Sequence, residues 1–115
     1  MKKTIPLFLF IFSTLLYSCS NQNCNKLPAN FSSYEEALTQ IESSSFKIEE
    51  SVNTSKSSWI RSASYYSCDG KKGYLLIETD SKTYIHKNIP LSVWEGFKEA
   101  DSFGRFYSLK IKGVY

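Results

Sequence analysis

The chain has 115 residues, of which 16% are aromatic and 22% are charged, with 14 Lys and Arg against 11 Asp and Glu. This length fits one domain and excludes a large multidomain enzyme. The first 18 residues contain no acid and are mostly apolar, and without Lys2 and Lys3 the basic residues fall to 12 against the same 11 acids. Such a balance disfavours a strongly basic nucleic-acid binder.

Residues 1–18 have the pattern of a secretory signal. Lys2 and Lys3 precede an apolar run that extends from residue 5 to residue 17, which is shorter than the roughly 20 residues of a membrane-spanning helix. The run ends in Leu16-Tyr17-Ser18-Cys19, which resembles the bacterial lipobox. The resemblance implies a diacylglyceryl group on the Cys19 sulfur and cleavage before Cys19. The alternative is an ordinary signal peptide cut nearby, which would leave a free or bridged thiol.

The two other cysteines, Cys24 and Cys68, lie outside the signal. Thiols outside the cytoplasm tend to pair, and a bridge would close a span of 44 residues. Two free thiols are the alternative, because the sequence does not give the distance between them. The spacing of Cys24, Cys68 and the single histidine, His86, is not that of a structural zinc site, so we expect no metal.

Residues 19–31 are polar and lack periodicity, which predicts a tether between the lipid and the domain. A helix is expected to follow, with Ser32 as its N-cap and Glu35 completing a capping box. The apolar face of this helix comprises Tyr34, Ala37, Leu38 and Ile41.

Alternating and apolar runs predict strands over residues 46–49, 59–67, 74–79 and 83–87. The last three are separated by short turns, which favours an antiparallel meander. Residues 88–90 are expected to leave the sheet.

Two helical segments are predicted after the strands. Ser92 and Glu95 form a second candidate capping box, the helix breaks at residues 101–104, and residues 105–111 form a last short helix. We therefore predict a single α+β domain over residues 32–115. It is a small antiparallel three- to four-stranded meander, covered by an N-terminal helix and one or two C-terminal helices. Residues 32–55 carry a net charge of −4 and residues 56–115 a net charge of +4, which favours packing of the first helix beside the rest.

From about residue 57 onward, the order of motifs is a Tyr-rich strand, a Pro, a helix ending in Ala-Asp-Ser, then an aromatic pair and Ile-Lys. The segments that carry this pattern are Ser58-Trp59-Ile60, Ala63-Ser64-Tyr65, Gly73-Tyr74-Leu75, Thr83-Tyr84-Ile85-His86, Ile89-Pro90, Val93-Trp94, Phe97, Ala100-Asp101-Ser102, Gly104-Arg105-Phe106-Tyr107 and Ile111-Lys112. Residues 57–115 thus resemble the KTSC domain, named after the C-terminus of some lysyl-tRNA synthetases. One departure is Tyr84-Ile85-His86, where the family has Tyr-x-Tyr.

The resemblance implies RNA binding only through the fusion to a synthetase. A lipid-anchored protein outside the cytoplasm does not meet tRNA, and a net charge of +1 after residue 18 does not build a surface that neutralises phosphates. We therefore expect nucleic acid not to be the partner, and RNA binding is kept as the alternative.

Catalysis has little support in the sequence. His86 lacks an orienting acid or a nucleophile at a recognisable spacing, and there is no phosphate loop, nucleophile elbow or cofactor motif. A small hydrolase or redox protein would instead depend on His86 or Cys68. We expect a non-catalytic module without a cofactor.

Binding by a sheet surface is better supported. Alternation along the strands must send some Tyr rings outward, where they can stack on a sugar ring, a base or a side chain, although most of these rings are expected to be core. The candidate ligand contacts are Tyr65, Tyr84, His86 and Arg105. The sequence thus predicts a membrane-anchored lipoprotein of the bacterial cell envelope, with its domain outside the cytoplasm and an envelope protein or glycan as partner.

Overall fold

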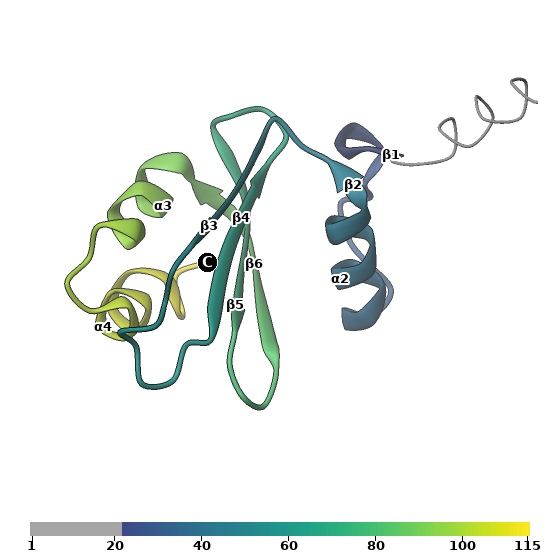
Figure 1. Ribbon diagram of the computed structural model, residues 1–115. Coiled ribbons are helices and arrows are strands. Elements are labelled where there is room, and N and C mark those ends of the chain that lie inside the picture. Colours follow the sequence, from purple (N-terminus) through teal and green to yellow (C-terminus); the bar gives the residue numbers. More distant parts are fainter. Residues whose placement is uncertain (1–21) are drawn as a thin grey trace, which may run out of the picture.

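The computed structural model describes residues 22–115 (Figure 1). The predicted signal sequence and Cys19 lie outside these residues. The elements in chain order are β1 (Gln22–Asn23), η2 (Cys24–Lys26), α2 (Tyr34–Ser43), β2 (Ser44–Ser45), β3 (Ile48–Val52), β4 (Ser62–Ser67), β5 (Lys72–Glu78), β6 (Thr83–Pro90), α3 (Leu91–Lys98), α4 (Phe103–Phe106) and η3 (Tyr107–Ile111). Within residues 22–115, no helix is both long and apolar enough to cross a bilayer.

The centre of the molecule is an antiparallel sheet with strand order β3-β4-β5-β6. The register places Tyr65 opposite Leu75 and Leu75 opposite His86. Since side chains alternate along each strand, these three residues share one face of the sheet. The α+β fold predicted from the sequence, with helices beside a four-stranded antiparallel sheet, is confirmed.

One face of the sheet is covered by α3, α4 and η3 (Figure 1). Its hydrophobic core comprises Ile60, Ala63, Tyr65, Leu75, Ile77, Ile89, Trp94, Phe97, Phe103, Tyr107 and Ile111. Stacked rings run through this core: Tyr65 lies 5.3 Å from Trp94, and Phe97 lies 5.9 Å from Trp94 and 5.1 Å from Phe103, between ring centroids. Burial of such large side chains is what allows so small a domain to be stable.

The other face of the sheet is covered by α2, which stands on the opposite side from α3 and α4 (Figure 1). Aromatic pairs connect this layer to the sheet, with Phe31 6.3 Å from Tyr74 and Phe46 5.4 Å from Tyr66. The two-residue strands β1 and β2 pair in parallel and form a separate small sheet at the end of α2.

Three local predictions are wrong for identifiable reasons. The N-cap of α2 is Ser33, whose Oγ accepts a hydrogen bond from the Glu36 N–H, one position later than predicted. Ser92 lies inside α3 and is not its cap, because the Leu91 N–H bonds to the Lys71 carbonyl and the helix begins directly at the sheet edge.

The third error concerns residues 88–90, which remain in the sheet. Asn88 adopts a positive φ of 59°, and the ladder between β5 and β6 shifts register between Gly73 and Leu75. A Cβ at Gly73 would lie 2.2 Å from the Tyr66 carbonyl oxygen, so this close approach of strands requires glycine. The irregularity lets β6 continue to Pro90.

Candidate ligand-binding site

Tyr65 is not available to a ligand. Its side chain is 0% exposed, it stacks on Trp94, and its hydroxyl donates to the Ile89 carbonyl at 2.8 Å. The alternation that was expected to send some Tyr rings outward sends this ring into the main core, because α3 covers that face of β4. The prediction that Tyr65 contacts a ligand is therefore corrected: it is a core residue.

His86 joins β6 to the C-terminal turns. Its Nε2 lies 2.8 Å from the Tyr107 hydroxyl, and its Nδ1 lies 3.3 Å from the Tyr115 backbone oxygen. Because that oxygen only accepts, Nδ1 carries the proton and Nε2 accepts from Tyr107. Burial lowers the pKa of His86, opposed by the hydrogen bond to Tyr115. Both ring nitrogens are thus engaged in holding the fold.

Tyr84 remains a candidate contact. It lies two residues before His86 on the same face of β6, and it is 36% exposed. The Lys82 ammonium lies 4.8 Å from its ring centroid, which is a cation–π distance. Tyr84 lines a hollow of about 310 Å³ together with Trp59, Thr79, Asp80 and Ser81.

Trp59 is a surface aromatic residue that sequence reasoning assigned to a strand and did not single out. It lies in the loop before β4, is 37% exposed, and packs edge-on against Tyr107 with 5.8 Å between centroids. A Cβ at Gly104 would lie 2.5 Å from its Nε1, so glycine at the start of α4 is what lets the indole lie there. The available signal was a large aromatic residue beside a polar Ser- and Lys-rich loop.

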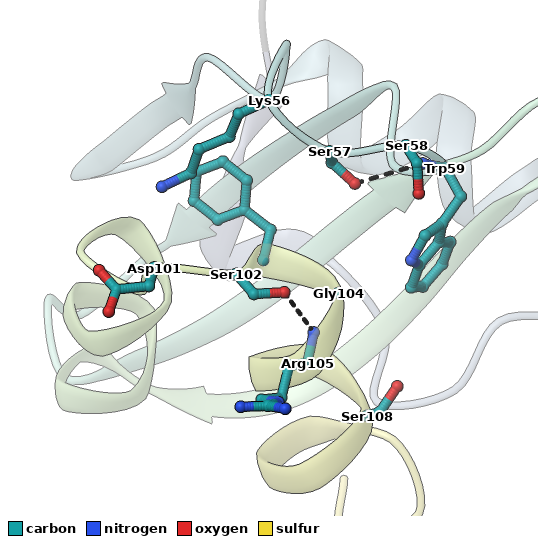
Figure 2. Close-up of a pocket in the computed structure, with 10 residues that line it drawn as sticks. Lys56, Ser57, Ser58, Trp59, Asp101, Ser102, Gly104, Arg105 and Ser108 are labelled. Carbon is teal, nitrogen blue, oxygen red and sulfur yellow. Dashed lines mark hydrogen bonds between the residues drawn. The ribbon is translucent and has the colours of Figure 1, made fainter.

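A second hollow, of about 390 Å³, is also lined by Trp59 (Figure 2). Its lining includes Lys56, Asp101, Arg105 and Ser108. We call the two hollows together, with Tyr84 in one, Arg105 in the other and Trp59 in both, the Trp59 surface.

Charge in the second hollow comes from Lys56, Asp101 and Arg105. Lys56 already donates to the Ala100 carbonyl at 2.9 Å and lies 4.6 Å from the Phe103 ring centroid. Arg105 is exposed, and the ion pairs between described residues involve only Arg61 and Lys98 as cations. Its guanidinium is therefore free to pair with an incoming anionic or hydroxyl-bearing group.

The arrangement is suited to binding. An indole face, a phenol and a guanidinium around shallow hollows suit stacking and hydrogen bonding to a sugar ring or a peptide. In the described part of the chain, no three His, Cys, Asp or Glu side chains gather as a metal site would require. The structure thus places Tyr84 and Arg105 in two hollows that share Trp59, joins His86 to Tyr107, and buries Tyr65 in the core.

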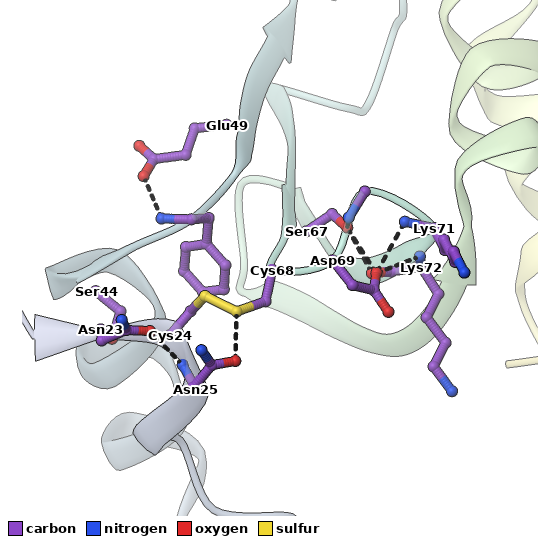
Figure 3. The surroundings of a disulfide bond; sticks show 12 residues. Asn23, Cys24, Asn25, Ser44, Glu49, Ser67, Cys68, Asp69, Lys71 and Lys72 are labelled. Carbon is purple, nitrogen blue, oxygen red and sulfur yellow. Dashed lines mark hydrogen bonds between the residues drawn. A yellow bond between two sulfur atoms is a disulfide. The ribbon is translucent and has the colours of Figure 1, made fainter.

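At the end of β4 that is farther from Trp59, Cys24 and Cys68 form a disulfide with 5.9 Å between Cα atoms (Figure 3). Residues 22–26, within the segment expected to be a tether, are thereby held against the domain as β1 and η2. Of the two alternatives that the sequence left open, the structure has the bridge.

Comparison with known proteins gives a family match for the C-terminal part of the chain. A search of curated proteins and a search of solved structures gave no match. Residues 56–115, which form β4, β5, β6 and the C-terminal helices, match the family model of the KTSC domain over more than half of the chain. The chain therefore belongs to the KTSC domain family.

Proposed function

We propose that the protein is a lipoprotein of the bacterial cell envelope, anchored through a lipid on Cys19. Its KTSC domain is a non-catalytic module that binds an envelope protein or glycan through the Trp59 surface. The proposal has two parts, the cellular location and the binding surface, and each is supported by a different feature.

The disulfide is the observation that best supports the proposed cellular location. Disulfides persist in oxidising compartments and are rare in the cytosol. Cys24 lies only five residues after the lipobox-like Cys19, so the bridge ties the chain to the domain immediately beyond the expected lipid. A bilayer anchor of two or more acyl chains gives stable attachment without a membrane-spanning helix.

The binding part is supported by the position and chemistry of the Trp59 surface. The loop that carries Trp59 precedes Ser62, at one end of β4, whereas Cys68 follows Ser67 at the other. Six strand residues separate these ends by about 20 Å, so a domain anchored near the disulfide presents Trp59 away from the anchor.

The proposed lipid anchor and membrane location are tested with Cys19→Ala. In cells fed labelled palmitate, the wild-type chain should incorporate label and sediment with membranes, and the variant should do neither. A variant that is still lipidated and membrane-bound contradicts the assignment of Cys19.

The binding part is tested by cross-linking the acylated protein in intact cells. Trp59→Ala and Arg105→Ala should lose the wild-type cross-linked species, and Val114→Ala is the matched control because Val114 is 63% exposed. Equal cross-linking by all variants contradicts the Trp59 surface. Salt-sensitive binding of RNA by the purified protein would favour the nucleic-acid alternative instead.

A further inference from the structure

Five lysines gather at the disulfide end of the domain. All five are exposed, and they come from four separate segments of the chain. They are Lys26, Lys47, Lys71, Lys72 and Lys87. We call them the anchor-proximal lysines.

Their neighbours place these lysines around the bridge. Lys26 ends η2, which begins at Cys24; Lys71 lies in the turn after Cys68, and Lys72 begins β5 (Figure 3). A Cβ at Gly70, in the same turn, would lie 3.5 Å from the Lys47 Nζ.

Lys87 reaches the same end from β6. Its Nζ lies 3.4 Å from the Ala29 carbonyl, in the segment that follows η2. A hollow of about 390 Å³ between that segment and the sheet is lined by both Lys72 and Lys87, together with Cys68. The five ammonium groups therefore belong to one surface.

Three carboxylates lie near the same end, from Glu42, Glu49 and Asp69. Asp69 accepts from the backbone N–H groups of Lys71 and Lys72 at 2.8 and 3.1 Å, and Glu49 accepts from the Phe46 N–H at 3.0 Å. The surface keeps a net charge of +2, whereas the other residues from 22 to 115 carry seven basic and eight acidic side chains. The positive excess of the domain is thus concentrated where the chain leaves for the membrane.

The distance from the expected lipid to this surface is short. Cys24 is five positions after Cys19, and even a fully extended chain of five residue steps spans at most about 18 Å. The disulfide fixes the far end of that segment on the domain. Lysines around the bridge therefore come within reach of the headgroup layer, where each basic side chain is attracted by anionic lipid.

We propose that the anchor-proximal lysines lie on the anionic phospholipid headgroups of the leaflet that holds the Cys19 lipid, and so orient the domain. This inference rests on the proposed lipid anchor. Together, the lipid, the disulfide and the lysines fix which end of the sheet faces the bilayer. The Trp59 surface then points away from the membrane, toward a partner.

The test uses the full acylated protein in two kinds of vesicle, phosphatidylcholine alone and phosphatidylcholine with phosphatidylglycerol in equal parts. Each lysine is labelled with an amine-reactive reagent and its rate is read by mass spectrometry. The anchor-proximal lysines should react about fivefold more slowly on the anionic vesicles, a factor that matches roughly one charge–surface interaction each. Lys110 and Lys112, near the C-terminus, should react equally on both.

High salt and substitution of the lysines test whether the protection is electrostatic. Protection should disappear near 1 M salt, where the Debye length is about 3 Å. Lys71→Gln with Lys72→Gln should relieve the protection of Lys26 and Lys87, and Lys110→Gln with Lys112→Gln should leave it unchanged.

The two proposals fail in different ways. Protein that carries no lipid and stays off both vesicles contradicts the anchor. Protein that is acylated and bound to both vesicles, but whose anchor-proximal lysines react at equal rates on each, overturns the orienting surface and leaves the anchor standing.

Discussion

The two faces of the sheet are built in different ways. The face toward α3, α4 and η3 is a continuous core whose buried residues all lie between residues 60 and 111, with Ile48 and Val52 of β3 packed against its edge. The face toward α2 depends on residues 22–46, which are joined to the sheet by aromatic pairs and by the Cys24–Cys68 bridge.

This difference separates the family module from what has been added to it. Residues 56–115 match the KTSC domain and contain every buried residue of the first core, whereas β3 and α2 lie outside the match and supply an edge strand and the second layer. The second layer connects the module to the N-terminal segment for which we propose a lipid anchor. We therefore expect the first face to determine global stability and the second to respond to reduction.

The largest effect is expected from Trp94→Ala. Trp94 is 0% exposed, stacks on Tyr65 and Phe97, and donates its indole N–H to the Glu50 carboxylate at 2.7 Å. Truncating a buried Trp costs about 3–5 kcal/mol, measured by chemical denaturation. Trp59→Ala is the control, since an indole that is 37% exposed should cost about 1–2 kcal/mol. Equal losses for the two variants would contradict the assignment of Trp94 to the core.

Reduction of the disulfide is expected to have the next largest effect. Closing a span of 44 residues stabilises a chain by about 4 kcal/mol in the chain-entropy model. Reductant should lower the melting midpoint, and amide exchange should accelerate in α2 before it does in β5. Cys24→Ser with Cys68→Ser should mimic reduction and make the midpoint insensitive to it. If reductant leaves the wild-type melting midpoint unchanged, the bridge does not stabilise the fold.

Gly104→Ala tests the link between α4 and the Trp59 surface. The added methyl group would meet the Trp59 Nε1, so the indole must move, at a cost of about 1–3 kcal/mol typical of overpacking. In a Trp94→Phe background, which leaves Trp59 as the single indole, fluorescence should report the displacement. Unchanged emission would show that Trp59 does not lie against Gly104.

Acid should destabilise the protein modestly through His86. Burial lowers the pKa of His86 below its ordinary value of 6.5 in the folded state, so the unfolded chain binds the proton more tightly. Stability is therefore full above about pH 6.5 and falls as the pH decreases below that value. His86→Gln should remove this step in urea-unfolding midpoints measured across pH, and a step that persists in the variant must come from another group.

Glu50 and its partner Lys98 should make stability depend on pH in a second, more acidic range. Hydrogen bonds from Lys98 and Trp94 lower the pKa of Glu50 below its ordinary value of 4.5. The stability from this carboxylate is present above that value and is lost only as the pH falls through the lower, folded-state pKa. Glu50→Gln should therefore lower the midpoint above about pH 4.5, approach the wild-type midpoint at lower pH, and leave the His86 step intact.

Much of the fold was predictable because periodicity and turn chemistry act locally. The helix around Ala37, the strands from residue 62 to residue 87 and the two C-terminal helical segments follow from such patterns. The continuation of β6 through Asn88 could not be predicted from the sequence. It depends on a register shift against β5, which is visible only once the two strands are paired.

The candidate site was less predictable than the fold. Arg105 and Tyr84 were named from the sequence, but their relation comes from Trp59, which lines the hollow of each. Tyr65 was placed on the wrong side because alternation identifies two faces without saying which one a helix will cover. The role of His86 depends on Tyr107 and Tyr115, far from it in sequence.

The central claim is a lipid on Cys19 at the start of the mature chain. Its most direct test is the intact mass of the protein purified from envelope membranes, followed by fragmentation of its N-terminal peptide. We expect residues 1–18 to be gone and the first residue to be a cysteine that carries a diacylglyceryl group. A full-length, unacylated chain recovered from the cytosol would contradict the account.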